Sequence, residues 1–190
     1  MSHISQASCI DTARLRLRPM QIEDAEQAHR LWTEPAMLRS VWGGVHVAFE
    51  QSVAVIERSI ELYESRGAGL WCAFLLEEDL LAGFAGFWFT EDVADPQLVF
   101  GVTRPRWQRG LATEMLRALL RYGFEDLAFS RVIVELPHDG LQQMLVRLGF
   151  AACRRFDDER TKLAEVTPAT FRDDGSRHRL LPAPQPLLRA

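Results

Sequence analysis

The residues best suited to chemistry lie in one short segment, Phe100–Glu114, which reads FGVTRPRWQRGLATE. An apolar run ends at Val102, a loop with Arg109 and Gly110 follows, and the apolar spacing of a helix starts at once. The first N–H groups of a helix have no partner within the helix and carry partial positive charge. Gly110 lets the backbone turn its N–H groups inward. This order of residue types predicts a binding site for a pyrophosphate group.

The candidate binding residues of this loop all lie at the helix start or just before it: Trp107, Gln108, Arg109, Gly110, Leu111, Ala112 and Thr113. Arg109 adds a full positive charge, Ala112 is small enough for a ligand to lie close, and Thr113 offers a hydroxyl group. The segment lacks the GK[ST] of a Walker A loop and also lacks GxGxxG, which disfavours a nicotinamide dinucleotide. The alternative is a tight strand-to-helix turn without a ligand.

Hydrophobic periodicity predicts the elements that position the loop. Strands are expected at Ala13–Arg18, Leu70–Leu76, Leu81–Phe89, Leu98–Val102, Arg131–Leu136, Ala151–Phe156 and Thr161–Val166, and helices at Gln21–Trp32, Phe49–Ser65, Leu111–Leu127 and Gly140–Leu148. Thr90–Pro96 is expected to be an acidic loop. On the helix after the loop, Glu114, Arg117, Arg121 and Glu125 are expected to face water. The mixture of hairpins and β-α-β units indicates an α+β fold with a mixed sheet and helices on its faces.

The length of 190 residues predicts one domain, for which we take residues 1–167. Residues 168–190 form a proline-rich C-terminal extension. It is more apolar than a linker because it contains four leucines, Leu180, Leu181, Leu187 and Leu188. The extension could dock on the body of the domain, dock on a partner such as the second copy in a homodimer, or remain a loose tail.

Composition limits the partners and the location. The formal net charge is −4, and the arginines are scattered among acids, which argues against nucleic-acid binding. No apolar run is long enough to span a membrane, and the first residues lack the apolar core of a signal peptide. The three cysteines are far apart, which favours reduced thiols in a cytoplasmic protein. No HExxH-type set is present among the histidines and carboxylates, so we expect no metal.

Four motifs in order resemble one family. WQRGLATEML resembles the [RQW]-x-x-G-x-[GA] acyl-CoA loop of the GNAT superfamily of N-acyltransferases, and the ATE after the glycine resembles its ribosomal-protein N-terminal acetyltransferase (RimJ/RimL-like) branch. TARLRLRPMQIEDA resembles the opening strand and helix of that branch, LAGFAGFWF its glycine-containing strand, and RLGF its closing motif. The resemblance covers about Thr12 to Val166.

The resemblance implies a fold and a reaction. In this family a mostly antiparallel sheet splays two parallel strands apart and seats acyl-CoA in the gap. Here those strands are Leu98–Val102 and Arg131–Leu136. Backbone near Val102 would pair with the pantetheine arm, and the N–H groups from Gln108 to Thr113 would hold the pyrophosphate. The implied activity is acetyl transfer from acetyl-CoA to a primary amine, either a peptide or protein N-terminus or a small molecule, by direct attack on the thioester.

Two residues are candidates for proton transfer. Glu135 ends the second splayed strand and could take the amine proton or orient a water, or it could be an exposed partner of an arginine. His138 follows Pro137 near the expected thioester, or it is an ordinary loop histidine. The Asn and Ser that family members often carry before the last helix have no counterpart here, nor has the Tyr that some use as general acid. These departures motivate an alternative, a non-catalytic acyl-CoA-binding or interaction module.

Overall fold

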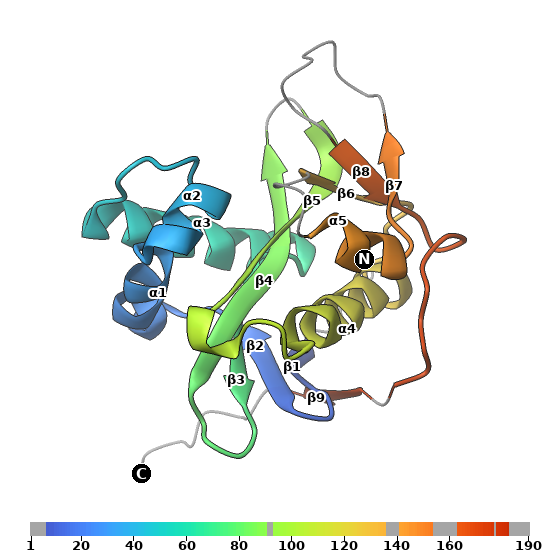
Figure 1. Ribbon diagram of the computed structural model, residues 1–190, viewed down its shortest axis with the longest axis horizontal. Helices are drawn as coiled ribbons and strands as arrows, with labels where there is room; N and C mark the ends of the chain where they lie inside the picture. The colour runs from blue at the N-terminus through green and yellow to red at the C-terminus, as the bar shows by residue number, and fades with distance from the viewer. Residues whose placement is uncertain (1–6, 91–92, 136–140, 154–162, 177, 183–190) are drawn as a thin grey trace.

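The described residues of the computed structural model, 7–90, 93–135, 141–153, 163–176 and 178–182, form a nine-stranded sheet (Figure 1). The strands are β1 Ala7–Asp11, β2 Leu15–Pro19, β3 Leu70–Leu75, β4 Leu81–Thr90, β5 Val93–Val102, β6 Val132–Glu135, β7 Ala151–Cys153, β8 Leu163–Val166 and β9 Arg179–Pro182. Their order across the sheet is β7-β8-β6-β5-β4-β3-β2-β1-β9. Neighbouring strands are antiparallel except β5 and β6, which are parallel. The mostly antiparallel α+β fold expected from the sequence is therefore confirmed.

Helices cover both faces of the sheet. Figure 1 shows α1–α3 on one side of β4, and α4 and α5 on the other. The helices are α1 Ala25–Trp32, α2 Pro35–Val41, α3 Phe49–Arg66, α4 Leu111–Glu125 and α5 Gln142–Arg147, with 3-10 turns η1 at Ile22–Asp24 and η2 at Arg104–Arg106. Because β4 and β5 lie near the middle of the sheet, the loop between β5 and α4 lies at the end of its central strands.

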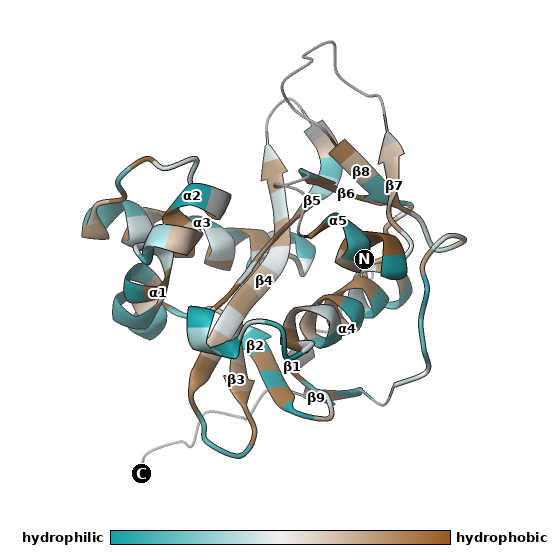
Figure 2. Cartoon of the chain, in the orientation of Figure 1, coloured by the Kyte–Doolittle hydropathy of each residue, from teal (hydrophilic) through white to brown (hydrophobic). Residues whose placement is uncertain are grey.

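The two faces of the sheet are buried because alternate residues of its central strands point to opposite sides. Trp71 and Phe87 pack in the cluster that contains α4, whereas Cys72 and Phe84 pack in the cluster that contains α1–α3. Figure 2 shows hydrophobic colour along β3 and hydrophilic colour over much of α1. Burial on both faces explains why these strands read as nearly continuous apolar runs.

The prediction of an acidic loop at Thr90–Pro96 is wrong for the described residues that follow residue 92. Val93 to Pro96 belong to β5, and Val93 pairs with Thr90 of β4. Asp95 is tolerated in the strand because Arg131 Nε donates to its carboxylate at 2.8 Å. The prediction failed because the local sequence does not reveal that Asp95 pairs with Arg131, 36 residues further along the chain.

Three elements were not expected from the sequence: α2, β1 and β9. The segment after Thr167 returns to the sheet, where Arg179–Pro182 pairs antiparallel with β1. Of the options left open for this extension, its described part docks on the body of the domain. The leucines Leu180 and Leu181 lie opposite Ile10 and Cys9 of β1.

Docking of this segment corrects a further expectation about α4. Arg121 does not face water, because its side chain is only 7% exposed and binds Asp173, His178 and the carbonyl oxygen of Ser176. Arg117 is largely covered as well and pairs with Asp174 at 2.9 Å. The helical pattern placed these arginines on the polar face correctly, but the returning chain covers that face.

Candidate active site

The loop between β5 and α4 is folded by two left-handed residues and one indole contact. Gln108 has a φ of 59° and Gly110 a φ of 75°. Trp107 is half exposed, and its Nε1–H donates to the carbonyl oxygen of Val102 at 2.7 Å. This bond ties the start of the loop back to the last residue of β5. Because Gln108 has a side chain, its left-handed conformation carries strain that glycine would not.

The N-terminus of α4 is open. Its N-cap residue is Gly110, which has no side chain to accept a bond from the first turn. The first bond of the helix runs from Glu114 N–H to the Gly110 carbonyl at 3.1 Å, so Leu111, Ala112 and Thr113 have no helical acceptor for their N–H groups. The Leu111 side chain is buried in the core, so this residue offers only its backbone to a ligand. Three donors and the helix dipole therefore converge on one point.

Two hollows flank this helix start. The larger, of about 360 Å³, is lined by Gly110 and Thr113 together with Arg14 and residues of the returning segment, including Ser176. The smaller, of about 210 Å³, is lined by Arg109 and Leu111, again with Arg14. Arg14 thus lies between the two spaces that adjoin the predicted phosphate site.

The backbone of β5 next to the loop faces the strand β6. Thr103 N–H donates to the Ala82 carbonyl of the β4 side at 2.9 Å. Since the backbone groups of successive strand residues point to opposite edges, those of Val102 point away from β4 and toward β6. Between the described parts of β5 and β6, one residue pair is in register, Gln97 with Ile133. The mixed sheet thus contains the parallel pair on which the splayed arrangement depends.

Glu135 ends β6 on the face opposite α4. Val132 and Val134 pack in the cluster that contains α4, so alternation turns Glu135 toward the other face, where it is exposed. The register with Gln97 places Glu135 level with Val99, about 10 Å along the strand from Val102. The structure therefore does not bring Glu135 against the loop residues. The other candidate, His138, lies outside the described residues.

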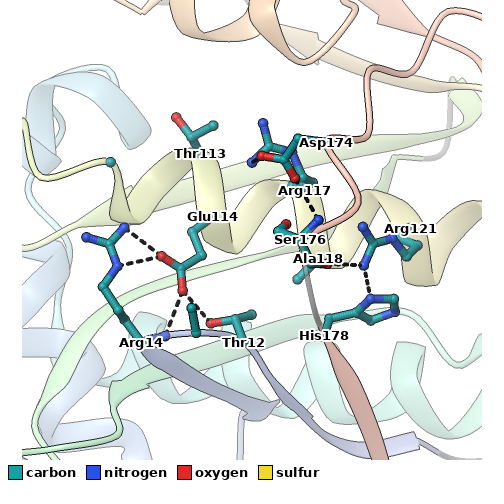
Figure 3. Close-up of a pocket in the computed structure, with 12 residues that line it drawn as sticks. Thr12, Arg14, Thr113, Glu114, Arg117, Ala118, Arg121, Asp174, Ser176 and His178 are labelled. Atoms are coloured by element: carbon teal, nitrogen blue, oxygen red, sulfur yellow. Dashed lines mark hydrogen bonds and ion pairs between the residues drawn. The ribbon is translucent and has the colours of Figure 1, made fainter.

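Sequence reasoning missed three residues that hold the loop (Figure 3). Glu114 was expected to face water, yet its carboxylate accepts bonds from Thr12 Oγ1 at 2.7 Å and from Arg14 Nε at 2.7 Å. Arg14 also donates through Nη1 to the Arg109 carbonyl at 2.8 Å. The opposite charges in TARL and ATE were the available signal, but nothing local indicates that the two motifs meet.

The other loop arginines differ in how their charge is balanced. Arg106 pairs with Glu78 at 2.6 Å, and this hydrogen bond holds the pKa of the Glu78 carboxyl below its usual value. Arg109 is exposed, and none of the ion pairs found between described residues includes it. Its charge is thus available to an anionic ligand at the helix start.

An uncapped helix start after a central strand, beside a parallel pair in an otherwise antiparallel sheet, agrees with the sequence comparison. Residues 14–151 match the family described as "Acetyltransferase (GNAT) domain". The chain belongs to the GNAT acetyltransferase family. It is an acyltransferase, and the resemblance noted in its motifs is confirmed.

Known proteins agree with this membership of the GNAT family. The "Uncharacterized N-acetyltransferase YoaA" of Bacillus subtilis (strain 168) is 23% identical over 144 residues, which cover 74% of this chain and 81% of that protein. An acetyltransferase structure from Agrobacterium tumefaciens str. C58 superposes with a TM-score of 0.73 at 18% identity, over 83% of this chain and 93% of the other. The structure of "RimL- Ribosomal L7/L12 alpha-N-protein acetyltransferase", in complex with coenzyme A, gives a TM-score of 0.71 at 16% identity, over 84% and 98%. These likenesses of low identity support the GNAT fold.

The described part of this GNAT chain contains neither a membrane-spanning helix nor a cluster of metal-ligand side chains. No helix there is both long and apolar enough to cross a membrane. In the same residues, no three or more His, Cys, Asp or Glu side chains gather as metal ligands.

Proposed function

We propose that the chain is an acetyl-CoA-dependent N-acetyltransferase that holds the diphosphate of its acyl donor at the start of α4. The observation that carries the proposal is the open helix terminus at Gly110, with three backbone donors and no side-chain cap. The family uses acetyl-CoA, and a diphosphate carries the charge that such a terminus stabilises. Arg109, exposed and outside the ion pairs described above, would add a direct charge contact.

The two faces of the sheet suggest how donor and acceptor meet. The donor would enter from the α4 side, at the loop, and pass along the β6-facing edge of β5 near Val102. Glu135 points to the other face, which carries α1–α3. An amine arriving from that face would approach β5 on the side that carries Glu135, which lies level with Val99. Donor and proton acceptor on opposite faces give an arrangement for direct transfer without a covalent enzyme intermediate.

Every bond and proton of the proposed reaction can be accounted for with the amine, the thioester, Glu135 and solvent. The amine nitrogen attacks the thioester carbonyl carbon, so an N–C bond forms and the C–S bond breaks. The amine proton passes through water toward Glu135, which lies about 10 Å along the strand from Val102, and the departing sulfur takes a proton from solvent. The N–H group of Val102 is the candidate donor to the thioester oxygen, since the Val102 carbonyl is engaged by Trp107.

A peptide or protein N-terminus is the first acceptor to test. The RimL structure, to which this chain is similar, is described as a ribosomal L7/L12 α-N-protein acetyltransferase. A small-molecule amine is the other acceptor class that direct thioester attack admits, and turnover of one class over the other decides between them.

The first experiment measures thermal unfolding with and without acetyl-CoA, in the parent and in Gly110→Glu. Ligand at 100 times its Kd stabilises a fold by about 2.7 kcal/mol, which raises the midpoint by several degrees. We expect this rise in the parent and its loss in the folded variant. No rise with acetyl-CoA or longer acyl-CoAs would overturn the proposal.

A second experiment follows release of coenzyme A thiol with a peptide panel and a panel of free amines. Glu135→Gln is the test of the base, and Gln143→Glu, an exposed change on α5, is a matched surface control. We expect Glu135→Gln to lower kcat at neutral pH and to leave acetyl-CoA affinity unchanged. Equal kcat in parent and Glu135→Gln would remove Glu135 from the mechanism.

A further inference from the structure

The β1–β2 hairpin reaches across to the first turn of α4 and the loop before it. Four contacts converge on the Glu114 carboxylate, from Thr12 Oγ1, Arg14 N–H, Arg14 Nε and Arg14 Nη2, at 2.6–2.8 Å. A fifth contact runs from Arg14 Nη1 to the Arg109 carbonyl. Figure 3 shows Thr12 and Arg14 directed at Glu114 from below the helix. The partners are about 100 residues apart in the sequence, so only the tertiary fold brings them together.

We propose that Thr12, Arg14 and Glu114 form a positioning clamp that sets the phosphate-binding conformation of the loop. The inference rests on the proposed function and deepens it. None of the three residues needs to touch the ligand, because the clamp acts through the Arg109–Gly110 peptide and through the charge at the helix start.

The first part of the argument is the orientation of one peptide group. In a planar trans peptide the C=O and the following N–H point in opposite directions. Arg14 holds the Arg109 carbonyl toward the hairpin, and the N–H of Gly110 therefore points away from Arg14. Gly110, which follows this peptide, and Gln108, one residue before it, are both left-handed. Loss of the Arg14 contact would leave it able to rotate.

The second part concerns charge. Glu114 lies in the first turn of α4, where a carboxylate suits the helix dipole but repels an anionic ligand at the same terminus. Arg14 compensates this charge with its bidentate contact. With Arg14 in place the Glu114 side chain is only 14% exposed, and removal of Arg14 leaves its charge to Thr12 and to water, beside the anion site. The clamp thus lets α4 keep an acidic residue in its first turn without excluding a diphosphate.

The charge argument predicts the sign of a double-mutant cycle. We expect Arg14→Ala to weaken coenzyme A binding by about tenfold or more, since it frees both the peptide and the Glu114 charge. Glu114→Gln keeps one acceptor oxygen for Thr12 Oγ1 and Arg14 N–H, loses the acceptor for the Arg14 guanidinium, and removes the charge that repels an anion. It should therefore weaken binding by less than about threefold. Arg14→Ala combined with Glu114→Gln should bind coenzyme A more tightly than Arg14→Ala alone. Arg14→Lys should recover little, because lysine has no planar fork for two acceptors.

The experiment measures the Kd of coenzyme A by titration calorimetry, alongside thermal unfolding of each unliganded variant. Arg16→Ala is the matched control, because Arg16 lies two residues further along the same hairpin and makes an equally exposed ion pair with Asp11. Pantetheine, which lacks the diphosphate, is the probe for specificity. We expect the clamp variants to lose discrimination between coenzyme A and pantetheine, while Arg16→Ala keeps it.

The outcomes separate this inference from the proposed function. If the parent binds no coenzyme A, the proposed function fails. If the parent binds and folded Arg14→Ala binds equally well, the clamp is overturned although the function stands. Equally weak binding by Arg14→Ala and the double variant would reject the positioning role. A Kd that follows the unfolding temperature across all variants, Arg16→Ala included, would reject it as well, because the hairpin would then act through stability alone.

Discussion

Two helices of this protein differ in how the N–H of the N-cap residue is satisfied. At the start of α3, Gln51 folds back so that its Oε1 accepts the N–H of Ala48 at 2.8 Å, and Gln51 N–H donates to the Ala48 carbonyl at 3.1 Å. Neither N-cap residue, Ala48 or Gly110, has a side chain that caps the first turn. The N–H of Ala48 is satisfied by a side chain of its own helix, whereas no such bond to the N–H of Gly110 is found between described residues.

The difference matters because unpaired N–H groups are costly unless something satisfies them. The open start of α4 lies beside Arg109 and two hollows, whereas α3 begins after an exposed loop. In α4 the residues that hold the terminus in shape, Thr12 and Arg14, come from another part of the chain. The start of α4 thus combines the absence of a capping side chain with support from the distant residues Thr12 and Arg14, as the proposed diphosphate site requires.

The largest expected effect comes from placing the same side chain at both termini. Gly110→Asp should weaken acetyl-CoA binding about a hundredfold, because a carboxylate would take the donors and repel the diphosphate. Ala48→Asp, at the N-cap of α3, should leave binding unchanged and stabilise the fold by about 0.5–1 kcal/mol. Calorimetric titration and chemical unfolding measure the two quantities. Equal Kd values in Gly110→Asp and the parent would contradict the comparison.

At the start of η1, the 3-10 turn that leads into α1, Asp24 accepts the N–H of Gln21 at 2.8 Å and pairs with Arg18 at 2.6 Å. Burial opposes ionisation of Asp24, but the bonds from Arg18 and Gln21 outweigh it and place its pKa below the usual value. We expect Asp24→Asn to cost about 2 kcal/mol near neutral pH, less than a fully buried pair would, because Arg18 is 30% exposed.

This second prediction has a pH signature. A carboxyl with a lowered folded-state pKa contributes stability above its ordinary pKa and loses it as the pH falls through the folded value. The difference in unfolding free energy between parent and Asp24→Asn should therefore be constant above about pH 5 and shrink toward about pH 2. Urea unfolding across that range measures it. A difference that does not change with pH would show that the ion pair is not its source.

Alanine substitutions at two left-handed glycines test whether the start of α4 binds the ligand while the end of α3 does not. Gly67 ends α3 with a φ of 68°, and Gly110 begins α4 with a φ of 75°. Alanine at either position should lower the unfolding free energy by about 1 kcal/mol, because a Cβ disfavours this conformation. Thermal unfolding and coenzyme A titration should show equal losses of stability, but weaker binding in Gly110→Ala alone. Weaker binding in Gly67→Ala would point to a general loosening instead.

The smallest effect is expected at the start of α3, where Gln51 bonds the N–H of Ala48. Gln51→Ala removes the acceptor for Ala48 N–H, which is exposed, so water replaces it at a cost of about 0.5 kcal/mol. Unfolding in urea should detect this change, and the Kd for acetyl-CoA should stay at its parent value. A shift in that Kd would mean that the two helix termini are coupled.

Much of the architecture was predictable because it depends on local patterns. Leu111, Met115 and Leu119 recur at helical spacing and do form the buried side of α4. The loop at Gly110 was predicted from glycine and arginine at a strand-to-helix junction. Glu125 faces water as expected, but three other polar side chains do not: Asp95, Glu114 and Arg121 each meet a partner distant in the sequence.

The sequence by itself determined most of the elements, the α+β class and the glycine-containing turn before α4, because side-chain spacing and backbone freedom act within a few residues. Only the tertiary structure decided that the extension adds β9 beside β1, that Arg121 is buried, and that Arg14 holds the loop. Strand pairing and ion pairs of this kind join segments tens of residues apart. Their cost in chain entropy is offset only when the whole sheet assembles, so no local pattern encodes them.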